Sequence, residues 1–247
     1  MSETLDDARV ARLAGVPGGL RGFGRRHPEW WAMLAAAGAW IWMIAVPHPH
    51  AAHHGHGPPA GPGALAAAAM VVAMMLPLTI PGIRGMALSS TRRHRAVAGF
   101  LAGYLAVWML VMSVLAAGWT FAASLAGWKW AAVGTVAVAA LWEAVRPTHR
   151  HAEHEHRPGP HAASGWRADA DCARHGVTAG IRCVGACWAL MAACVAFAHS
   201  LPVMVVLFGV QLGGRYGPRI PAGLAALAVL GTGLAAVAAR LAAGHAV

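Results

Sequence analysis

The sequence alternates between long, nearly uncharged apolar runs and short segments rich in arginine, histidine, glycine and proline. Several runs reach or exceed the roughly 20 residues that a helix needs to cross a bilayer. Backbone polar groups inside a bilayer must be satisfied within the protein, so runs of this kind predict helices. The six runs cover residues 30–46, 64–80, 96–125, 130–145, 177–212 and 220–241.

Proline marks breaks inside two of these runs. The fifth run is too long for one span, and Ser200 and Pro202 can begin a new helix within it, as an N-cap and a first-turn residue. Pro77 and Pro81 are expected to kink or end the helix of the second run. With the fifth run divided in two, the sequence predicts about seven transmembrane helices.

Basic residues gather in alternate segments between the runs. With the N-terminus inside, the inner segments hold five, four, five and two arginines, whereas the outer segments hold Lys129 and, near the C-terminus, Arg240. Cytoplasmic loops of membrane proteins carry such an excess, so the pattern predicts the N-terminus inside and the C-terminus outside. The same pattern accounts for the net charge of +10 without nucleic acid as a partner.

The composition agrees with a membrane protein. Of the 247 residues, 58% are hydrophobic and 11% are charged, whereas about 25% of a typical soluble domain is charged. We therefore expect an all-α, polytopic transmembrane helical bundle whose surroundings are the lipid bilayer. Residues 1–29 are expected to form a cytoplasmic tail. Residues 30–243 are expected to form a single transmembrane domain, with loops at 47–63 outside and 146–176 inside.

Sulfur-bearing side chains line one of the predicted helices. Cys183 and Cys187 lie four residues apart, which places them on one helical face and about 6 Å apart along the axis. Met191 extends this stripe by another turn. Cys194 returns to nearly the same face, but at roughly 16 Å from Cys183 it is too far along the axis to share an ion with it.

Two methionines of another helix can complete a site with these thiols. Met74 and Met75 come just before the proline of the second run, where a kink would direct them across the bundle. Thiolates and thioethers select soft ions such as Cu(I). Buried cysteine and methionine also serve as ordinary packing residues, so spacing alone does not decide between the two roles.

Histidines concentrate in the two longest polar segments between runs. The outer segment holds five within nine residues, and the inner segment interleaves four with Glu153 and Glu155. Imidazoles at such density bind Cu(II), Ni(II) or Zn(II) by composition alone, although a solvated loop of this composition can also bind nothing. The predicted histidine ligands are His50, His53, His54 and His56 outside, and His151, His154 and His156 inside.

Three blocks of sequence carry a family resemblance. They are Ala73-Met74-Met75-Leu76-Pro77, Gly103-Tyr104-Leu105-Ala106-Val107-Trp108 and Cys183-Val184-Gly185-Ala186-Cys187-Trp188-Ala189-Leu190-Met191. Together they resemble a bacterial family of predicted metal-binding integral membrane proteins, some of whose members are labelled copper chaperones. The similarity covers about residues 64–240. It implies metal binding and a multi-pass protein of the bacterial cytoplasmic (inner) membrane.

The chain departs from this family at two places. Ala186 stands where the family usually has the first of two adjacent cysteines. Pro147 is followed by histidines, whereas the family's inner loop usually carries further cysteines, and here Cys172 is alone. These departures shift the expected metal ligands toward histidine.

Three functions remain open at this point. The first is copper handling in the membrane, as a chaperone, loading or transport protein, with copper ahead of nickel or zinc as the bound ion. The outer loop would collect the ion, the Cys/Met site would hold it, and the inner loop would pass it to an acceptor protein. The alternatives are a membrane thiol redox protein and a non-catalytic accessory subunit of a membrane complex. The sequence shows no phosphate-binding loop and no GxSxG motif, so it gives no support for a conventional enzyme.

Overall fold

The structure, a computed structural model, describes residues 27, 29–46, 63–90, 92–145, 165–197, 200–216 and 221–245. Every regular element in these ranges is helical, which confirms the all-α expectation for this part of the chain. The α-helices are α3 (Trp30–Ala45), α4 (Ala64–Met75), α5 (Ile80–Ser89), α6 (Arg93–Ala126), α7 (Trp128–Val145), α8 (Trp166–Ala196), α9 (Leu201–Tyr216) and α10 (Ala222–His245), and the 3-10 helix η2 covers Pro77–Thr79.

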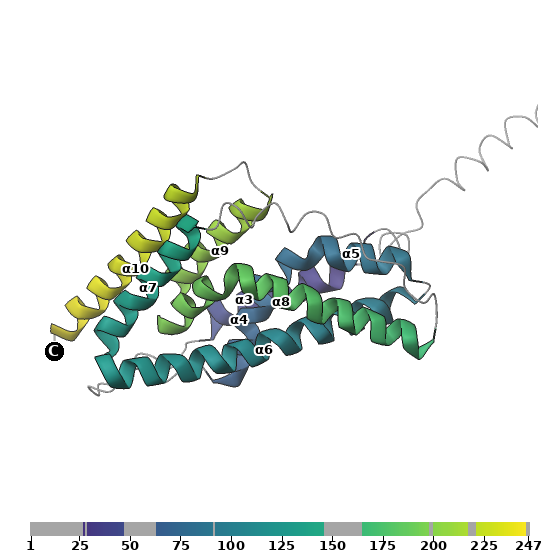
Figure 1. Cartoon of the computed structure of the whole chain (residues 1–247), viewed down its shortest axis with the longest axis horizontal. Coiled ribbons are helices and arrows are strands. Elements are labelled where there is room, and N and C mark those ends of the chain that lie inside the picture. The colour runs from purple at the N-terminus through teal and green to yellow at the C-terminus, as the bar shows by residue number, and fades with distance from the viewer. Residues whose placement is uncertain are drawn as a thin grey trace, which may run out of the picture.

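The two longest helices, α6 and α8, form the main helix pair of the molecule and lie side by side along its length (Figure 1). They are parallel, because Gly99 of α6 faces Cys172 of α8 and, further along both helices, Val107 faces Gly180. Glycines let the backbones approach closely, and a Cβ at Gly103 would meet the main chain of α8. The close packing that small residues favour in membrane helices is therefore realised here.

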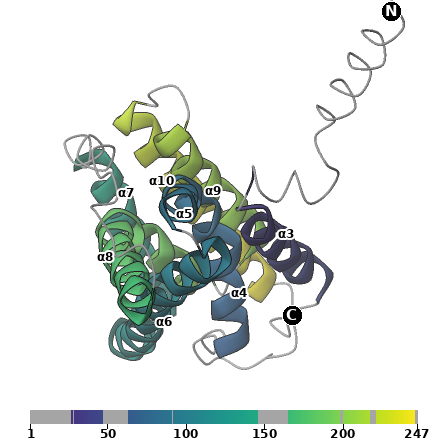
Figure 2. The same cartoon turned by 90° about the vertical axis from the view of Figure 1, so that its right-hand side faces the viewer.

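Helices α7 and α10 form a second packed pair, inclined to α6 and α8 at one end of the molecule (Figure 1). A Cβ at Gly233 of α10 would press on Val136 of α7, whereas one at Gly231 would meet nothing within 4 Å. Of these two glycines, only Gly233 lies at a close helix contact. Helices α3 and α4 lie on the side of α6 away from α7, and α5 packs on the first part of α6 (Figure 2).

The predicted proline breaks are confirmed. Helix α4 ends at Met75, η2 follows from Pro77, and α5 begins at Ile80, with a bend of 40° between the two arms. The long fifth run is divided, since α8 ends at Ala196 and α9 begins at Leu201.

Two further features end helices in this bundle. Gly127 ends α6 with a φ of 76°, a left-handed conformation that glycine adopts without a Cβ clash. At the end of α8, Arg240 of α10 donates hydrogen bonds to the carbonyls of Ala196 (3.4 Å) and Phe197 (2.7 Å). The Phe197 carbonyl also accepts a 3.1 Å hydrogen bond from the Ser200 N–H, and a cation at this end complements the helix dipole.

Helix α8 begins earlier than the sequence suggests, at Trp166 rather than near Val177. The last part of the segment expected to be a polar loop is therefore helical. The charged residues of this part do not predict a helix from the sequence. Packing on α6 stabilises it, since Ala168 and Cys172 are buried and Asp169 accepts a 2.7 Å hydrogen bond from Arg95 of α6.

Three described helices are long and apolar enough to cross a membrane, namely α6, α8 and α10. The bent pair of α4 and α5 would make a fourth. Helices α3 and α9 are apolar but have 16 residues each, or about 24 Å of length against a hydrocarbon core of about 30 Å. The count of seven spans and the orientation remain predictions.

Candidate functional site

The sulfur-bearing residues of α8 point into the bundle. Cys183, Cys187, Met191 and Cys194 are all buried, as the predicted stripe requires. They belong to the larger of the two hydrophobic clusters of the structure, whereas Cys172 belongs to the smaller cluster, near the start of α8. The four cysteines, all within the described residues, form no disulfide.

Helix α4 brings three methionines to this stripe. Met70, Met74 and Met75 are completely buried. The Sγ of Cys183 lies 3.9 Å from the Sδ of Met75, and the Sγ of Cys194 lies 4.0 Å from the Sδ of Met74. The adjacent methionines thus meet different thiols of α8, because neighbouring residues on a helix point about 100° apart.

A hydroxyl group joins the first of these contacts. Tyr104 of α6 is completely buried and donates a hydrogen bond of 3.1 Å to the Sγ of Cys183. The preceding residue, Gly103, allows α6 to approach α8 closely enough for this contact. Cys183 therefore has a thioether and a hydroxyl as neighbours, one from α4 and one from α6.

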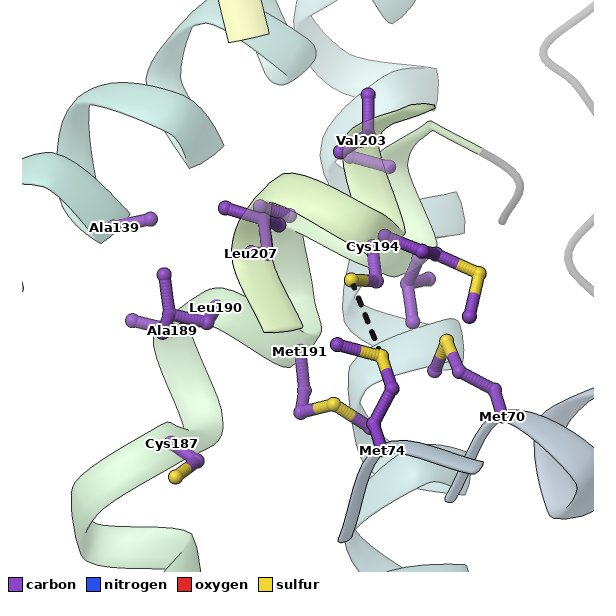
Figure 3. Packing of buried hydrophobic residues seen from close by; sticks show 14 of the residues in the cluster. Met70, Met74, Ala139, Cys187, Ala189, Leu190, Met191, Cys194, Val203 and Leu207 are labelled. Carbon is purple, nitrogen blue, oxygen red and sulfur yellow. Dashed lines mark hydrogen bonds between the residues drawn. The ribbon is translucent and has the colours of Figure 1, made fainter. Parts of the chain in front are cut away.

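The second contact lies in a larger group of sulfur atoms. Figure 3 shows the side chains of Met70, Met74 and Met191 gathered around Cys194, with the dashed line joining Cys194 to Met74. Cys187 lies apart from this group, and its sulfur points away from it (Figure 3). The structure therefore contains two sulfur stations. We name them after the orientation that the sequence predicts: the inner station is Cys183, Met75 and Tyr104, and the outer station is Cys194, Met74, Met70 and Met191.

This arrangement differs from the single site expected from the sequence. Met74 and Met75 were expected to form one soft site together with Cys183, Cys187 and Met191. Instead, Met75 contacts Cys183, and Met74 contacts Cys194. The spacing along the helix had already placed Cys194 too far from Cys183 to share its ion.

Sequence reasoning did not assign roles to Tyr104 or Met70. The sequence did contain a clue to each residue. Tyr104 lies in one of the three blocks that carry the family resemblance, and Met70 shares a helical face with Met74.

The histidines predicted as ligands lie outside the described residues. They are His50, His53, His54 and His56 of the segment predicted to lie outside and His151, His154 and His156 of the segment predicted to lie inside. Within the described ranges, no three His, Cys, Asp or Glu side chains come together in a group that could hold a metal ion. The candidate donors in this part of the chain are therefore thiols supplemented by thioethers, a set that suits a soft ion.

Comparison with known proteins gives one match. A family model described as PpoB2, copper chaperone, matches residues 65–241. The match spans α4 to nearly the end of α10 and includes every residue of both sulfur stations, whereas the outer histidine segment precedes it. No match was found among the curated proteins or among the solved structures.

Proposed function

The chain belongs to the PpoB2 copper chaperone family, and we propose that it is an integral membrane protein that binds Cu(I) at its buried thiols and thioethers. The observation that carries this proposal is the pair of contacts between α8 and α4, Cys183 to Met75 and Cys194 to Met74. Each contact joins a thiol to a thioether, and each thiol is buried, so each station provides two soft donors shielded from water.

The separation of the sulfur atoms also suits a bound metal. With a metal–sulfur bond of about 2.3 Å, as in zinc thiolate sites, two sulfur ligands of a trigonal ion lie about 4.0 Å apart. The two contacts measure 3.9 and 4.0 Å. An ion could therefore bind at either station with little movement of the helices. The Tyr104 hydroxyl would donate to the thiolate that forms when Cys183 loses its proton to bind the ion.

The two stations together suggest a path for the ion. Cys183 and Cys194 are roughly 16 Å apart along α8, but Met74 and Met75 are adjacent in the chain and each contacts one of the thiols. Met191 lies beside the outer station (Figure 3). We propose that Cu(I) passes between the stations by exchanging one sulfur ligand at a time.

We further propose that the protein lies in the bacterial cytoplasmic membrane, with its N-terminus inside. Arg182 is exposed on α8 and directly precedes Cys183, and a long basic side chain at this position can extend to the cytoplasmic headgroups. The inner station would then lie near the cytoplasmic face and the outer station deeper in the bilayer. The outer histidine segment would collect copper, and the inner segment would pass it to an acceptor protein.

Titration with Cu(I) tests the binding proposal. The purified protein in detergent would compete with a chromogenic Cu(I) chelator, and the expected result is two bound ions per chain. Removing one station with Cys183→Ala and Met75→Leu should leave one ion, as should removing the other with Cys194→Ala and Met74→Leu. At the station that carries the substitutions, the affinity for Cu(I) should fall by more than about tenfold. Loss of a residue that only supports a metal ligand already lowers metal affinity by about 10–100-fold.

Two substitutions in the smaller hydrophobic cluster provide the controls. Cys172→Ala removes a buried thiol and Met86→Leu a buried thioether away from the stations. Neither should change the number of bound ions or their affinity. Binding that survives both station variants but falls with Cys172→Ala would refute the assignment of the site.

A topology measurement tests the membrane proposal. A reporter enzyme that is active only outside the cytoplasm, fused to the C-terminus, should be active if the C-terminus lies outside. A fusion within the segment 146–164 should be inactive. The opposite pattern would reverse the two ends of the proposed path.

A further inference from the structure

Two prolines follow the methionines of α4 and remove hydrogen-bond donors from the backbone. Proline has no N–H, so the carbonyl four residues before it loses its helical partner. Because residue 77 is a proline, the carbonyl of Ala73 lacks this donor. Because residue 81 is also a proline, the carbonyl of Pro77 lacks it too. An unsatisfied carbonyl inside a bilayer costs free energy, and kinked membrane helices persist where neighbouring groups satisfy it.

Side chains from two other helices supply donors to these same two carbonyls. The indole Nε1 of Trp40 in α3 donates to the Ala73 carbonyl at 3.0 Å. The hydroxyl of Tyr216, at the end of α9, donates to the Pro77 carbonyl at 3.0 Å. The rings of Trp40 and Phe208 of α9 are in contact, with centroids 5.5 Å apart, so the two donor helices also touch each other.

We propose that Trp40 and Tyr216 are positioning residues that clamp the break between α4 and α5, and thereby hold the preceding methionine pair against the thiols of α8. This inference rests on the proposed copper binding. The Ala73 carbonyl belongs to the residue directly before Met74, and the Pro77 carbonyl lies two residues after Met75. A change in the bend would therefore move both thioethers relative to α8.

The substitutions Trp40→Phe and Tyr216→Phe test the clamp, because each removes a donor and keeps a ring. Without the clamp, a smaller fraction of the molecules has the observed bend between α4 and α5. The apparent affinity for Cu(I) falls in proportion to this fraction. We expect a loss of about fivefold for each variant, the ratio that one net hydrogen bond gives. X-ray absorption of the bound copper should show fewer sulfur neighbours. Trp31→Phe, also on α3 but packed against the other cluster, should change neither measurement.

A Pro77→Ala background separates positioning from general stability. Pro77→Ala restores an N–H that can bond the Ala73 carbonyl, so adding Trp40→Phe to it should cause little further loss of affinity. Equal losses in the two backgrounds would overturn the assignment of Trp40 to that carbonyl. If the wild type binds Cu(I) and both phenylalanine variants bind it equally well, the clamp is wrong and the copper proposal stands. If the wild type binds no Cu(I), both proposals fall.

Discussion

The close approach of α6 and α8 predicts opposite effects for the same substitution at two glycines of α8. A Cβ at Gly176 would overlap the main-chain carbonyl of Phe100 and would lie 3.0 Å from the amide nitrogen of Tyr104. A Cβ at Gly185, further along the same helix, would meet nothing within 4 Å. Gly176→Ala should therefore destabilise the bundle, whereas Gly185→Ala should stabilise it slightly or leave it unchanged.

The magnitudes follow from helix propensity and packing. Alanine is more favourable than glycine in a helix by about 0.8–1 kcal/mol, and Gly185→Ala can keep this gain. At Gly176 the obstacle is main chain, which cannot rotate away, so the helices must separate. Overpacking costs about 1–3 kcal/mol and is sometimes larger, and a gap of up to about 1 Å forfeits a quarter to a half of the dispersion energy of the affected contacts. Because the obstacle is main chain, we take the upper end of this range, about 3 kcal/mol, and subtracting the propensity gain of about 1 kcal/mol leaves an expected net loss of about 2 kcal/mol.

The assay is unfolding of both variants in the same mild detergent, with Cu(I) affinity as a second readout. Separation of α6 from α8 would lengthen the 3.1 Å contact between Tyr104 and Cys183, so Gly176→Ala should also weaken copper binding. Gly185→Ala should not. Equal stabilities of the two variants would refute the close packing of α6 on α8, and with it the reason that Tyr104 reaches the thiol.

Three other substitutions test individual contacts. Tyr104→Phe removes the donor to Cys183 and should weaken Cu(I) binding by about tenfold or more if the thiolate is the bound form, because a hydrogen bond to a charged group is worth about 1.5–3 kcal/mol; unchanged affinity would exclude that role. Arg240→Gln removes the guanidinium hydrogen bonds to the Ala196 and Phe197 carbonyls and should lower the free energy of unfolding by about 1–3 kcal/mol, and a neutral result would contradict the cap. Arg95→Gln breaks a largely exposed ion pair and should change stability by less than about 1 kcal/mol, so a larger unfolding shift would contradict that estimate.

The helices were predictable wherever the pattern of apolar residues sets their limits. The break between α8 and α9 followed from the length of the run and from Pro202, and the end of α4 followed from Pro77. The start of α8 was not predictable in this way, because the segment 166–176 carries four charged residues. Its helical state depends on packing against α6, and tertiary contacts of this kind override local composition.

The candidate site was predictable in its chemistry but not in its pairing. Helical spacing places the cysteines of α8 on one face, and their burial agrees with this. Spacing within one helix does not show which residue of another helix lies opposite. The contact of Cys194 with Met74 depends on how α4 crosses α8, which the linear sequence does not encode in any motif.

The clamp on the proline break shows why pairing across helices matters for the proposed function. Met74 and Met75 reach different thiols only while the end of α4 keeps its present position, and that position is shared with donors from α3 and α9. Without these donors, the two prolines would leave the Ala73 and Pro77 carbonyls without their i+4 partners, and the bend between α4 and α5 could vary. With both carbonyls satisfied, the bend becomes part of the packed bundle. The separation of sulfur atoms at each station is then determined by four helices together, α3, α4, α8 and α9, rather than by the cysteine stripe itself.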